Sequence, residues 1–182
     1  PLQSGCDTTL RRMARRTNQA QFSALVREAR QRSPEVGITT DVIVGFPGET
    51  DEEFEASFAF IESMDFAGMH VFRYSRRPGT AAARMRGHVA ESVSRERSAR
   101  LMAYADSQAQ RYAERFAGQA LDVLWEQVAG ATERGFVNIG YTDNYIRVRC
   151  IHPRALTNHI IRAQLDAYDV ERQQMRGIAI LD

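Results

Sequence analysis

The feature of this sequence that most constrains the fold is a pair of short apolar runs with one helix-like segment between them. Residues 37–46 are rich in β-branched side chains and stop at Pro47-Gly48, which is typical of a short buried strand. Residues 69–74 form a second run of this kind. Strands that alternate with helices over short connections indicate parallel pairing through right-handed crossovers, and therefore an α/β fold.

Capping signals predict where the helices begin. Thr50 with Glu53 matches a capping box, and so does Asn18 with Gln21. Asp7 is the expected N-cap of an earlier, short helix. A long, charged segment without Pro or Gly follows the second strand and is expected to connect two domains. The predicted helices cover residues 5–13, 19–33, 51–68 and 91–116.

After Gly118 the pattern changes to short strands. Thr142-Asp143-Asn144 predicts a tight turn between two of them. The segment 155–165 has no clear periodicity. The expected strands are 121–125, 136–141, 145–149 and a closing strand at 178–181. Several short strands in so few residues favour a small antiparallel β-barrel, so we predict an α/β domain over 1–116 and a β-barrel domain over 117–182.

Composition excludes several classes of protein. No apolar run approaches the roughly 20 residues that span a bilayer. The only cysteines, Cys6 and Cys150, form no Cys-x-x-Cys pair, which makes a disulfide framework or a cysteine metal cluster unexpected. The four histidines lack ligand spacing and are interpreted as structural or exposed: His70, His88, His152 and His159. We expect a cytoplasmic protein without a membrane partner.

Charge is unevenly distributed along a chain whose formal net charge is only +1. The segment 51–72 is acidic, the segment 73–116 is strongly basic, and the segment 117–182 is nearly balanced. Every side chain that carries a permanent positive charge is Arg, since the sequence contains no Lys. Any phosphate contact would therefore use a guanidinium group, which binds two oxygens at once. A basic surface is expected in the middle of the chain.

The sequence resembles the second half of the radical-SAM methylthiotransferases, and its carboxy-terminal part is similar to their TRAM domain. The motifs that carry the resemblance are Pro1-Leu2-Gln3-Ser4-Gly5-Cys6-Asp7, Met13-Ala14-Arg15-Arg16, Ile38–Thr50 and Tyr74–Ala82. The family often has Asn in place of Ala14, and Tyr-Thr in place of Thr17-Asn18. Since Asn18 can still cap a helix, this departure affects capping more than chemistry.

This resemblance implies a partial TIM-like (β/α) barrel followed by an OB-like RNA-binding β-barrel. It also implies S-adenosylmethionine and two [4Fe–4S] clusters in the intact enzyme, one of which cleaves the cofactor while the other carries the inserted sulfur. Neither set of cluster cysteines is present here. Because the chain starts at Pro1 without Met or a signal pattern, we expect the cysteines in a missing amino-terminal part, and we expect this chain alone to bind no cluster and be inactive.

The implied reaction inserts a methylthio group at C2 of a hypermodified adenosine beside the tRNA anticodon. The branch that acts on N6-threonylcarbamoyladenosine fits best, on the motifs at 70–75 and 140–145. The alternatives are the isopentenyladenosine branch, the branch that modifies a ribosomal protein, and a non-catalytic RNA-binding module. The expected partner is the anticodon stem-loop of tRNA.

Six residues are predicted to contact the cofactor: Gln3, Ser4, Arg15, Gly45, Phe46 and Ser75. Gln3 and Ser4 suit the ribose or methionine part, although a polar turn explains them equally well. Arg15 suits the methionine carboxylate, with Arg16 as the alternative. Gly45 permits close backbone approach to the adenine, whereas Val44 is expected in the core. Glu49 is interpreted as an ordinary acid of the first helical turn.

Seven residues are predicted to contact RNA: Arg76, Arg77, Tyr141, Asn144, Tyr145, Arg147 and Arg149. Arg76, Arg77 and Thr80 lie in a loop after a predicted strand. They could contact an anionic group of the cofactor or of tRNA, and a flexible basic loop without a ligand is the alternative. The other five combine aromatic rings and guanidinium groups in one hairpin. Unpaired bases are read by such stacking surfaces, while packing of the small barrel by Tyr141 and Tyr145 is the alternative.

Overall fold

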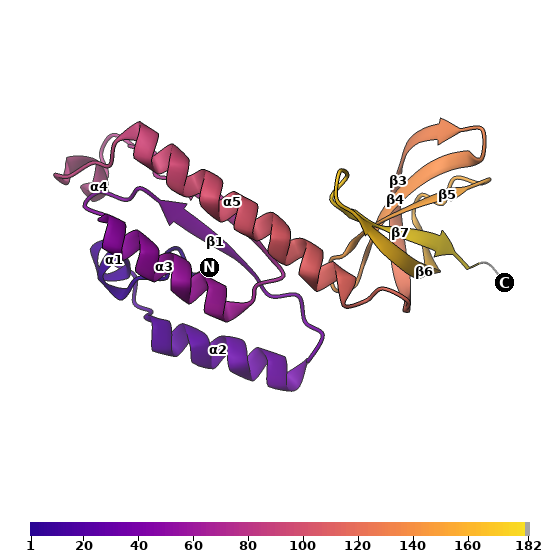
Figure 1. The fold of residues 1–182 in the computed structure, drawn as a ribbon, viewed down its shortest axis with the longest axis horizontal. Coiled ribbons are helices and arrows are strands. Elements are labelled where there is room, and N and C mark those ends of the chain that lie inside the picture. The colour runs from indigo at the N-terminus through magenta and orange to yellow at the C-terminus, as the bar shows by residue number, and fades with distance from the viewer. Residues whose placement is uncertain (181–182) are drawn as a thin grey trace. The chain divides into compact units, whose positions relative to one another are not determined.

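The computed structural model describes residues 1–180. The chain divides into two compact units, residues 1–108 and 109–182, which are described separately (Figure 1). The first contains α1 (Asp7–Arg12), α2 (Gln19–Arg32), β1 (Thr39–Val44), α3 (Asp51–Met64), β2 (Gly68–Arg73), α4 (Ala81–Arg84) and most of α5 (Glu91–Glu114). The second contains β3 (Ala120–Thr132), β4 (Gly135–Thr142), β5 (Arg147–His152), β6 (His159–Asp169) and β7 (Gln174–Ala179).

The sheet of the first unit has the predicted parallel arrangement. Strand β1 pairs with β2 in parallel, from Thr39 opposite Gly68 to Val44 opposite Arg73. On the other edge of β1, Gln3 forms a parallel bridge with Val42, so a third segment runs alongside. The mixed α/β character is confirmed, while a partial TIM-like barrel stays a prediction.

Two helices differ in detail from the prediction. Helix α1 has Cys6 as its N-cap, and the Asp7 carboxylate instead accepts the backbone N–H of Gln19, 2.8 Å away, at the start of α2. Asn18 does cap α2 by accepting the Gln21 N–H, but the reciprocal half of the predicted box is absent within residues 1–180. The predicted N-cap is therefore wrong for Asp7 and correct for Asn18.

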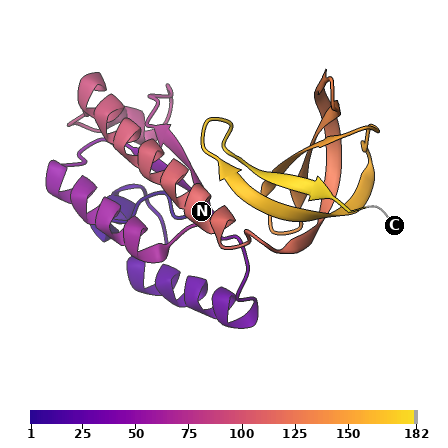
Figure 2. The ribbon, with the colours of Figure 1, turned by 45° about the vertical axis from the view of Figure 1, so that its right-hand side comes forward.

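Helix α3 begins as predicted and ends early. Thr50 and Glu53 form the complete capping box. The helix expected to continue to Gly68 stops at Met64, because Asp65 adopts a left-handed conformation at the C-cap. Gly68 is instead the first residue of β2. In both ribbon views α3 lies between α2 and α5 (Figures 1 and 2).

One apolar core joins the sheet and helices of the first unit. Its central side chains come from the amino-terminal segment, β1, α3, the α3–β2 connection and α5: Leu2, Val42, Val44, Phe54, Phe60, Ile61, Phe66 and Leu101. Val44 is thus in the core, as expected. Packing in this core positions β1 and β2, and therefore also the loops that follow the two strands.

The second unit is a closed five-stranded barrel in the order β3-β4-β5-β7-β6 (Figure 2). Its interior includes the only tryptophan, Trp125. The pairs are antiparallel except β5 with β7, which is parallel. The predicted strand at 145–149 begins only at Arg147, because Tyr145 has φ +65° and belongs to the turn. The later part of the segment without periodicity, from His159 onward, lies in β6. Residue 181 of the predicted closing strand lies outside the described residues.

A buried asparagine fastens the loop between β5 and β6. The Asn138 amide donates to the carbonyls of Phe136 and Arg154 and accepts the N–H of Leu156 at 2.9 Å. All three partners are backbone groups, and Asn138 has no solvent exposure. Since a buried amide without partners is costly, this residue specifies the loop conformation.

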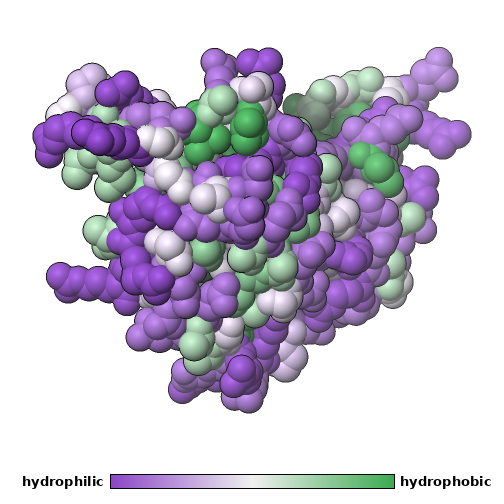
Figure 3. All heavy atoms as spheres, turned by 60° about the vertical axis from the view of Figure 1, so that its left-hand side comes forward, coloured by the Kyte–Doolittle hydropathy of each residue, from purple (hydrophilic) through white to green (hydrophobic). Residues whose placement is uncertain are grey.

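One face of the molecule carries mostly polar side chains (Figure 3). On the face drawn in Figure 3, apolar side chains gather in small patches separated by hydrophilic ones. Among residues 1–180, no helix is both long enough and apolar enough to cross a membrane.

Candidate functional site

A cavity of about 480 Å³ lies where β1 and β2 end. We call it the strand-end cavity; its lining includes Gly45, Tyr74, Ser75, Arg76, His88 and Ser94. Loops at the carboxyl ends of parallel strands carry the sites of α/β proteins. The cavity brings together two predicted cofactor residues, Gly45 and Ser75, with one predicted RNA residue, Arg76.

The loop after β1 is held in an unusual backbone conformation at Gly45. Its φ is +74°, in the region that favours glycine. A Cβ placed there would lie 2.7 Å from the Ser94 hydroxyl of α5. Phe46 follows and is buried, with its ring edge-on to Tyr74 at 5.4 Å between centroids. Backbone at residue 45 thus comes close to α5, and Phe46 supports the aromatic wall of the cavity.

Glu49 is not the ordinary first-turn acid that the sequence indicated. It precedes the N-cap Thr50 and its side chain is only 4% exposed. One carboxylate oxygen accepts from Arg97 of α5 at 2.6 Å and from the Gly45 N–H at 3.1 Å. Burial raises the pKa of Glu49, against the lowering effects of the Gly45 N–H and Arg97.

Arg97 is the residue at this site that the sequence analysis missed. Its side chain is 6% exposed, and its second terminal nitrogen lies 2.5 Å from Asp51. The guanidinium also lies over the Phe54 ring. Its partners are 46 and 48 residues away in the chain. A local sequence pattern therefore does not indicate the pairing. Arg97 clamps the loop from Gly45 to Glu49 onto α5.

The amino-terminal cofactor candidates are largely engaged with other protein groups. Gln3 is buried, with φ +67°, and its side-chain oxygen accepts from Arg15 at 3.2 Å. The buried Ser4 hydroxyl accepts the N–H of Cys6 and lies 3.4 Å from the Ser57 hydroxyl. Arg15 is exposed. Their cofactor roles stay predictions.

The two loop arginines differ in their surroundings. Arg76 lines the strand-end cavity, and its Nε donates to the Ala83 carbonyl at 3.0 Å. Arg77 is exposed and is not among the residues that line it. Thr80 accepts the Ala83 N–H as the cap of α4. The loop is therefore partly ordered by α4, which favours Arg76 over Arg77 as a ligand contact.

A second hollow of about 700 Å³ lies on the outside of the barrel. Strand register brings three of its lining residues side by side, because Tyr141 pairs with Leu124 and Leu124 with Ile160. Arg147 pairs with Tyr141 from the next strand but is not among the lining residues. These four side chains form one row across β5, β4, β3 and β6, which we call the barrel row. Tyr145 and Arg162 line the same hollow beside three acids, Asp122, Glu126 and Asp143.

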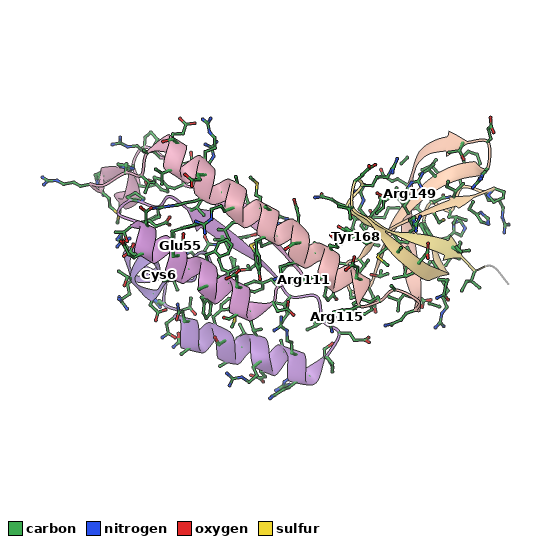
Figure 4. All side chains as sticks on the ribbon, in the orientation of Figure 1. Cys6, Glu55, Arg111, Arg115, Arg149 and Tyr168 are labelled. Carbon is green, nitrogen blue, oxygen red and sulfur yellow. The ribbon has the colours of Figure 1, made fainter. Side chains whose placement is uncertain are left out.

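The predicted RNA residues fall into two groups in the barrel. Tyr141, Tyr145 and Arg147 gather at the barrel row, and Tyr145 is 84% exposed. Asn144 instead accepts from the Thr142 hydroxyl at 2.5 Å inside the turn. Arg149 lies opposite Ile139 of β4 and opposite Arg176 of β7. Figure 4 labels Arg149 on the barrel. The row residues Leu124 and Ile160 and the hollow-lining Arg162 were missed, since they come from distant strands.

In the part of the chain that the structure describes, no three His, Cys, Asp or Glu side chains are placed so that they could hold a metal ion together. Cys6 and Cys150 are free, buried and in different units. Burial raises the pKa of the Cys150 thiol to about 11. These residues do not fit a [4Fe–4S] cluster, so we derive no step through one.

The chain is similar to known tRNA methylthiotransferases. It is 43% identical to the threonylcarbamoyladenosine tRNA methylthiotransferase of Bacillus subtilis, over 81% of this chain and 33% of that protein. The enzyme of the same name from Thermotoga maritima is 37% identical over 90% of this chain and 37% of its own length. A tRNA-2-methylthio-N6-dimethylallyladenosine synthase from Corynebacterium efficiens is 42% identical over 71% of this chain and 25% of its length.

These matches extend over residues of both units. The chain spans about a third of the length of the first two of these relatives. A scan against protein-family models finds no match. On the relatives, the chain belongs to the radical-SAM methylthiotransferase family and resembles its threonylcarbamoyladenosine tRNA branch.

Proposed function

We propose that this chain forms part of a tRNA methylthiotransferase that inserts a methylthio group at C2 of N6-threonylcarbamoyladenosine beside the anticodon. Residues 1–108 would contribute the last strands of a partial barrel and one wall of the cofactor pocket. The barrel of residues 109–182 would hold the RNA. The observation that carries the proposal is the identity of 37–43% to tRNA methylthiotransferases over most of this chain.

The cofactor part of the proposal is supported by the strand-end cavity. Gly45 lets backbone approach closely, and Ser75 lies at the cavity wall. These residues suit hydrogen bonds to an adenine nucleoside, and Phe46 supports a flat aromatic wall. In this family S-adenosylmethionine supplies the radical that abstracts hydrogen from the adenine ring. The residues named here would bind and orient the cofactor.

The RNA part is supported by the barrel row. Tyr141 and the exposed Tyr145 offer rings on which unpaired bases can stack, and Arg147 and Arg162 offer charge beside them. Three acids border the same hollow, so charge alone does not explain binding there. Stacking with local guanidinium contacts fits this mixture better than a purely electrostatic surface.

The test is binding of the chain to an unmodified tRNA anticodon stem-loop, measured by fluorescence anisotropy at several salt concentrations. Arg147→Ala combined with Arg162→Ala should weaken binding by about tenfold and reduce the salt dependence. Arg134→Ala is the matched control, because Arg134 is an exposed arginine in the β3–β4 turn, away from the barrel row.

Two results would count against the proposal. Equal affinity for an unrelated double-stranded RNA would favour a non-specific RNA-binding module. Equal weakening by Arg134→Ala would mean that the barrel row has no special role.

A further inference from the structure

The chain around the short helix α4 is strongly basic. Between residues 66 and 90 the sequence contains five arginines and neither Asp nor Glu. Two of these arginines have a place already: Arg73 lies 3.5 Å from Glu91, and Arg76 lines the strand-end cavity. The other three are exposed, do not line that cavity and flank or end α4. We call them the α4 arginines: Arg77, Arg84 and Arg86.

The α4 arginines have no acidic partner that would neutralise them. None of their guanidinium groups forms an ion pair or a hydrogen bond within residues 1–180. The exposed arginines of the neighbouring helix differ in this respect. Arg95 is bound to Glu91, and Arg100 is bound to Glu55. The positive charge around α4 is therefore available to a ligand, whereas much of the charge on α5 is already balanced.

The backbone that carries the α4 arginines is ordered. The Thr80 hydroxyl caps α4 and donates to the Arg77 carbonyl at 2.8 Å. At the other end of this segment, the Gly87 carbonyl accepts the N–H of Gly48 at 2.7 Å, which ties it to the loop after β1. A backbone that is ordered before binding loses less entropy when the ligand arrives. The three guanidinium groups thus form a prepared surface and not a flexible tail.

The composition of this surface favours phosphate groups of a nucleic acid. A guanidinium group presents a planar fork of donors that matches two phosphate oxygens. A membrane-binding surface adds exposed apolar side chains that enter the lipid. Residues 73–101 expose no large apolar side chain, and the nearest ones are Phe72 and Met102. Charge without exposed apolar groups fits the backbone of RNA better than a lipid surface.

From these observations we propose that the α4 arginines bind phosphate groups of the tRNA backbone next to the strand-end cavity. The proposal rests on the proposed function, because it gives the same RNA a second contact in addition to the barrel row. The segment follows β2 at its carboxyl end, and its Arg76 lines the cavity that we assign to the cofactor. Phosphate contacts at α4 would therefore hold the modified nucleotide beside the cofactor without reading the sequence.

The test is the salt dependence of binding between the chain and a fluorescein-labelled anticodon stem-loop, measured by anisotropy from about 50 to about 200 mM salt. The triple variant Arg77→Gln, Arg84→Gln and Arg86→Gln should reduce the slope of log K against log salt concentration by about 2–3. Its affinity should fall by about tenfold or more at the lowest salt concentration. A stem-loop with an altered loop sequence should show the same loss, because every sequence carries the same phosphates.

The matched control removes three exposed arginines from other surfaces: Arg27→Gln, Arg32→Gln and Arg134→Gln. It lowers the net charge by the same amount and so corrects for the general attraction between the chain and RNA. Its slope should change by less than about one. An equal change in the two triple variants would mean that the α4 arginines bind no phosphate of their own.

A second measurement locates the contact on the RNA. Cys6 and Cys150 are buried, so Ala81→Cys introduces an exposed thiol at the first residue of α4 for the attachment of iron–EDTA. Hydroxyl radicals from this position should cleave full-length tRNA in the anticodon arm. Cleavage confined to the other arms would overturn the proposal.

Two further outcomes would overturn it. One is an unchanged slope in the α4 triple variant, whose folding is checked by circular dichroism. The other is loss of binding to vesicles of phosphatidylcholine and phosphatidylserine with stem-loop binding unchanged, which would assign the α4 arginines to a lipid surface. Failure of the unaltered chain to bind the stem-loop contradicts the proposed function as well, whereas normal binding without an effect of the triple variant rejects the α4 arginines alone.

Discussion

At the scale of single residues, the Arg97–Glu49 pair gives an asymmetric prediction. Arg97→Leu leaves Glu49 ionised and buried with only backbone groups of Gly45 and Phe46 as partners, so it should destabilise the first unit by about 3–5 kcal/mol. Glu49→Gln keeps an acceptor for Gly45 and leaves Arg97 bound to Asp51, so it should cost about 1–2 kcal/mol. Urea unfolding followed by far-ultraviolet circular dichroism measures both costs.

The single tryptophan supplies an internal control for this measurement. Trp125 lies inside the barrel of the second unit, so its fluorescence reports that unit. Its transition should move much less than the dichroism signal in Arg97→Leu. Equal costs for the two substitutions would contradict a clamp built on a buried charge.

The same pair predicts a pH dependence. Burial already raises the pKa of Glu49, and Arg97 acts to lower it. Without Arg97 this pKa should rise further, so the folded state holds the proton more tightly than the unfolded chain. The ionised carboxylate then destabilises the fold above that pKa, and protonation relieves the cost as the pH falls. The stability deficit of Arg97→Leu should therefore be smaller at about pH 5 than at about pH 8; a deficit independent of pH would exclude this explanation.

Sequence reasoning at this scale worked for contacts between near neighbours in the chain. The Thr50–Glu53 cap and the Asn18 cap were predicted because three residues separate the partners. Arg97 and Glu49 were not paired, because the fold brings together groups 48 residues apart. Asp7 was assigned to the wrong backbone N–H for the same reason: its partner is in the next helix.

At the scale of elements, the start of α3 gives the next prediction. The Thr50 hydroxyl accepts the Glu53 N–H at 3.2 Å. Thr50→Ala should therefore destabilise the first unit by about 1 kcal/mol, whereas Thr50→Ser, which keeps the hydroxyl, should cost much less. Thermal unfolding followed by circular dichroism compares the two. If serine costs as much as alanine, the threonine methyl group, and not the cap, is the source of the stability.

Elements were predictable where local composition determines them. Strands β1 and β2 follow from their β-branched and aromatic runs, and their parallel pairing follows from the helix between them. Strand β6 was not predicted, because its outward positions mix apolar and charged groups, as with the 70% exposed Ile160 beside Arg162. Pairing with β3 and β7 makes this segment a strand.

At the scale of the whole molecule, the two distant cysteines give a prediction about metal content. Reconstitution of the chain with iron and sulfide should yield no visible absorbance of a [4Fe–4S] cluster, because such a cluster needs three or four cysteines. The same sample should still bind the anticodon stem-loop, which shows that it is folded. A cluster bound at one per chain, measured against a ferredoxin reconstituted in parallel, would refute the prediction that this chain alone binds no [4Fe–4S] cluster.

The organisation of the molecule was predicted more fully than its sites. An α/β part followed by a small closed barrel is confirmed. This organisation was predictable because helix caps and turn residues occur at the boundaries of the helices and strands along the sequence. The barrel row was only half foreseen: Tyr141 and Arg147 belong to one hairpin, but Leu124 and Ile160 join them through pairing with strands far away in the chain. Surfaces built across strands depend on register, which the sequence does not display.

The loop after β1 also limits how this protein can evolve. Residue 45 is restricted twice, by its φ of +74° and by the Ser94 side chain 2.7 Å from where a Cβ would lie. Replacing Ser94 with glycine would remove the collision and leave the backbone restriction in place. The Ser94→Gly substitution alone therefore does not make alanine acceptable at position 45. In an evolving population, a rearrangement of the loop backbone would have to come before alanine at position 45.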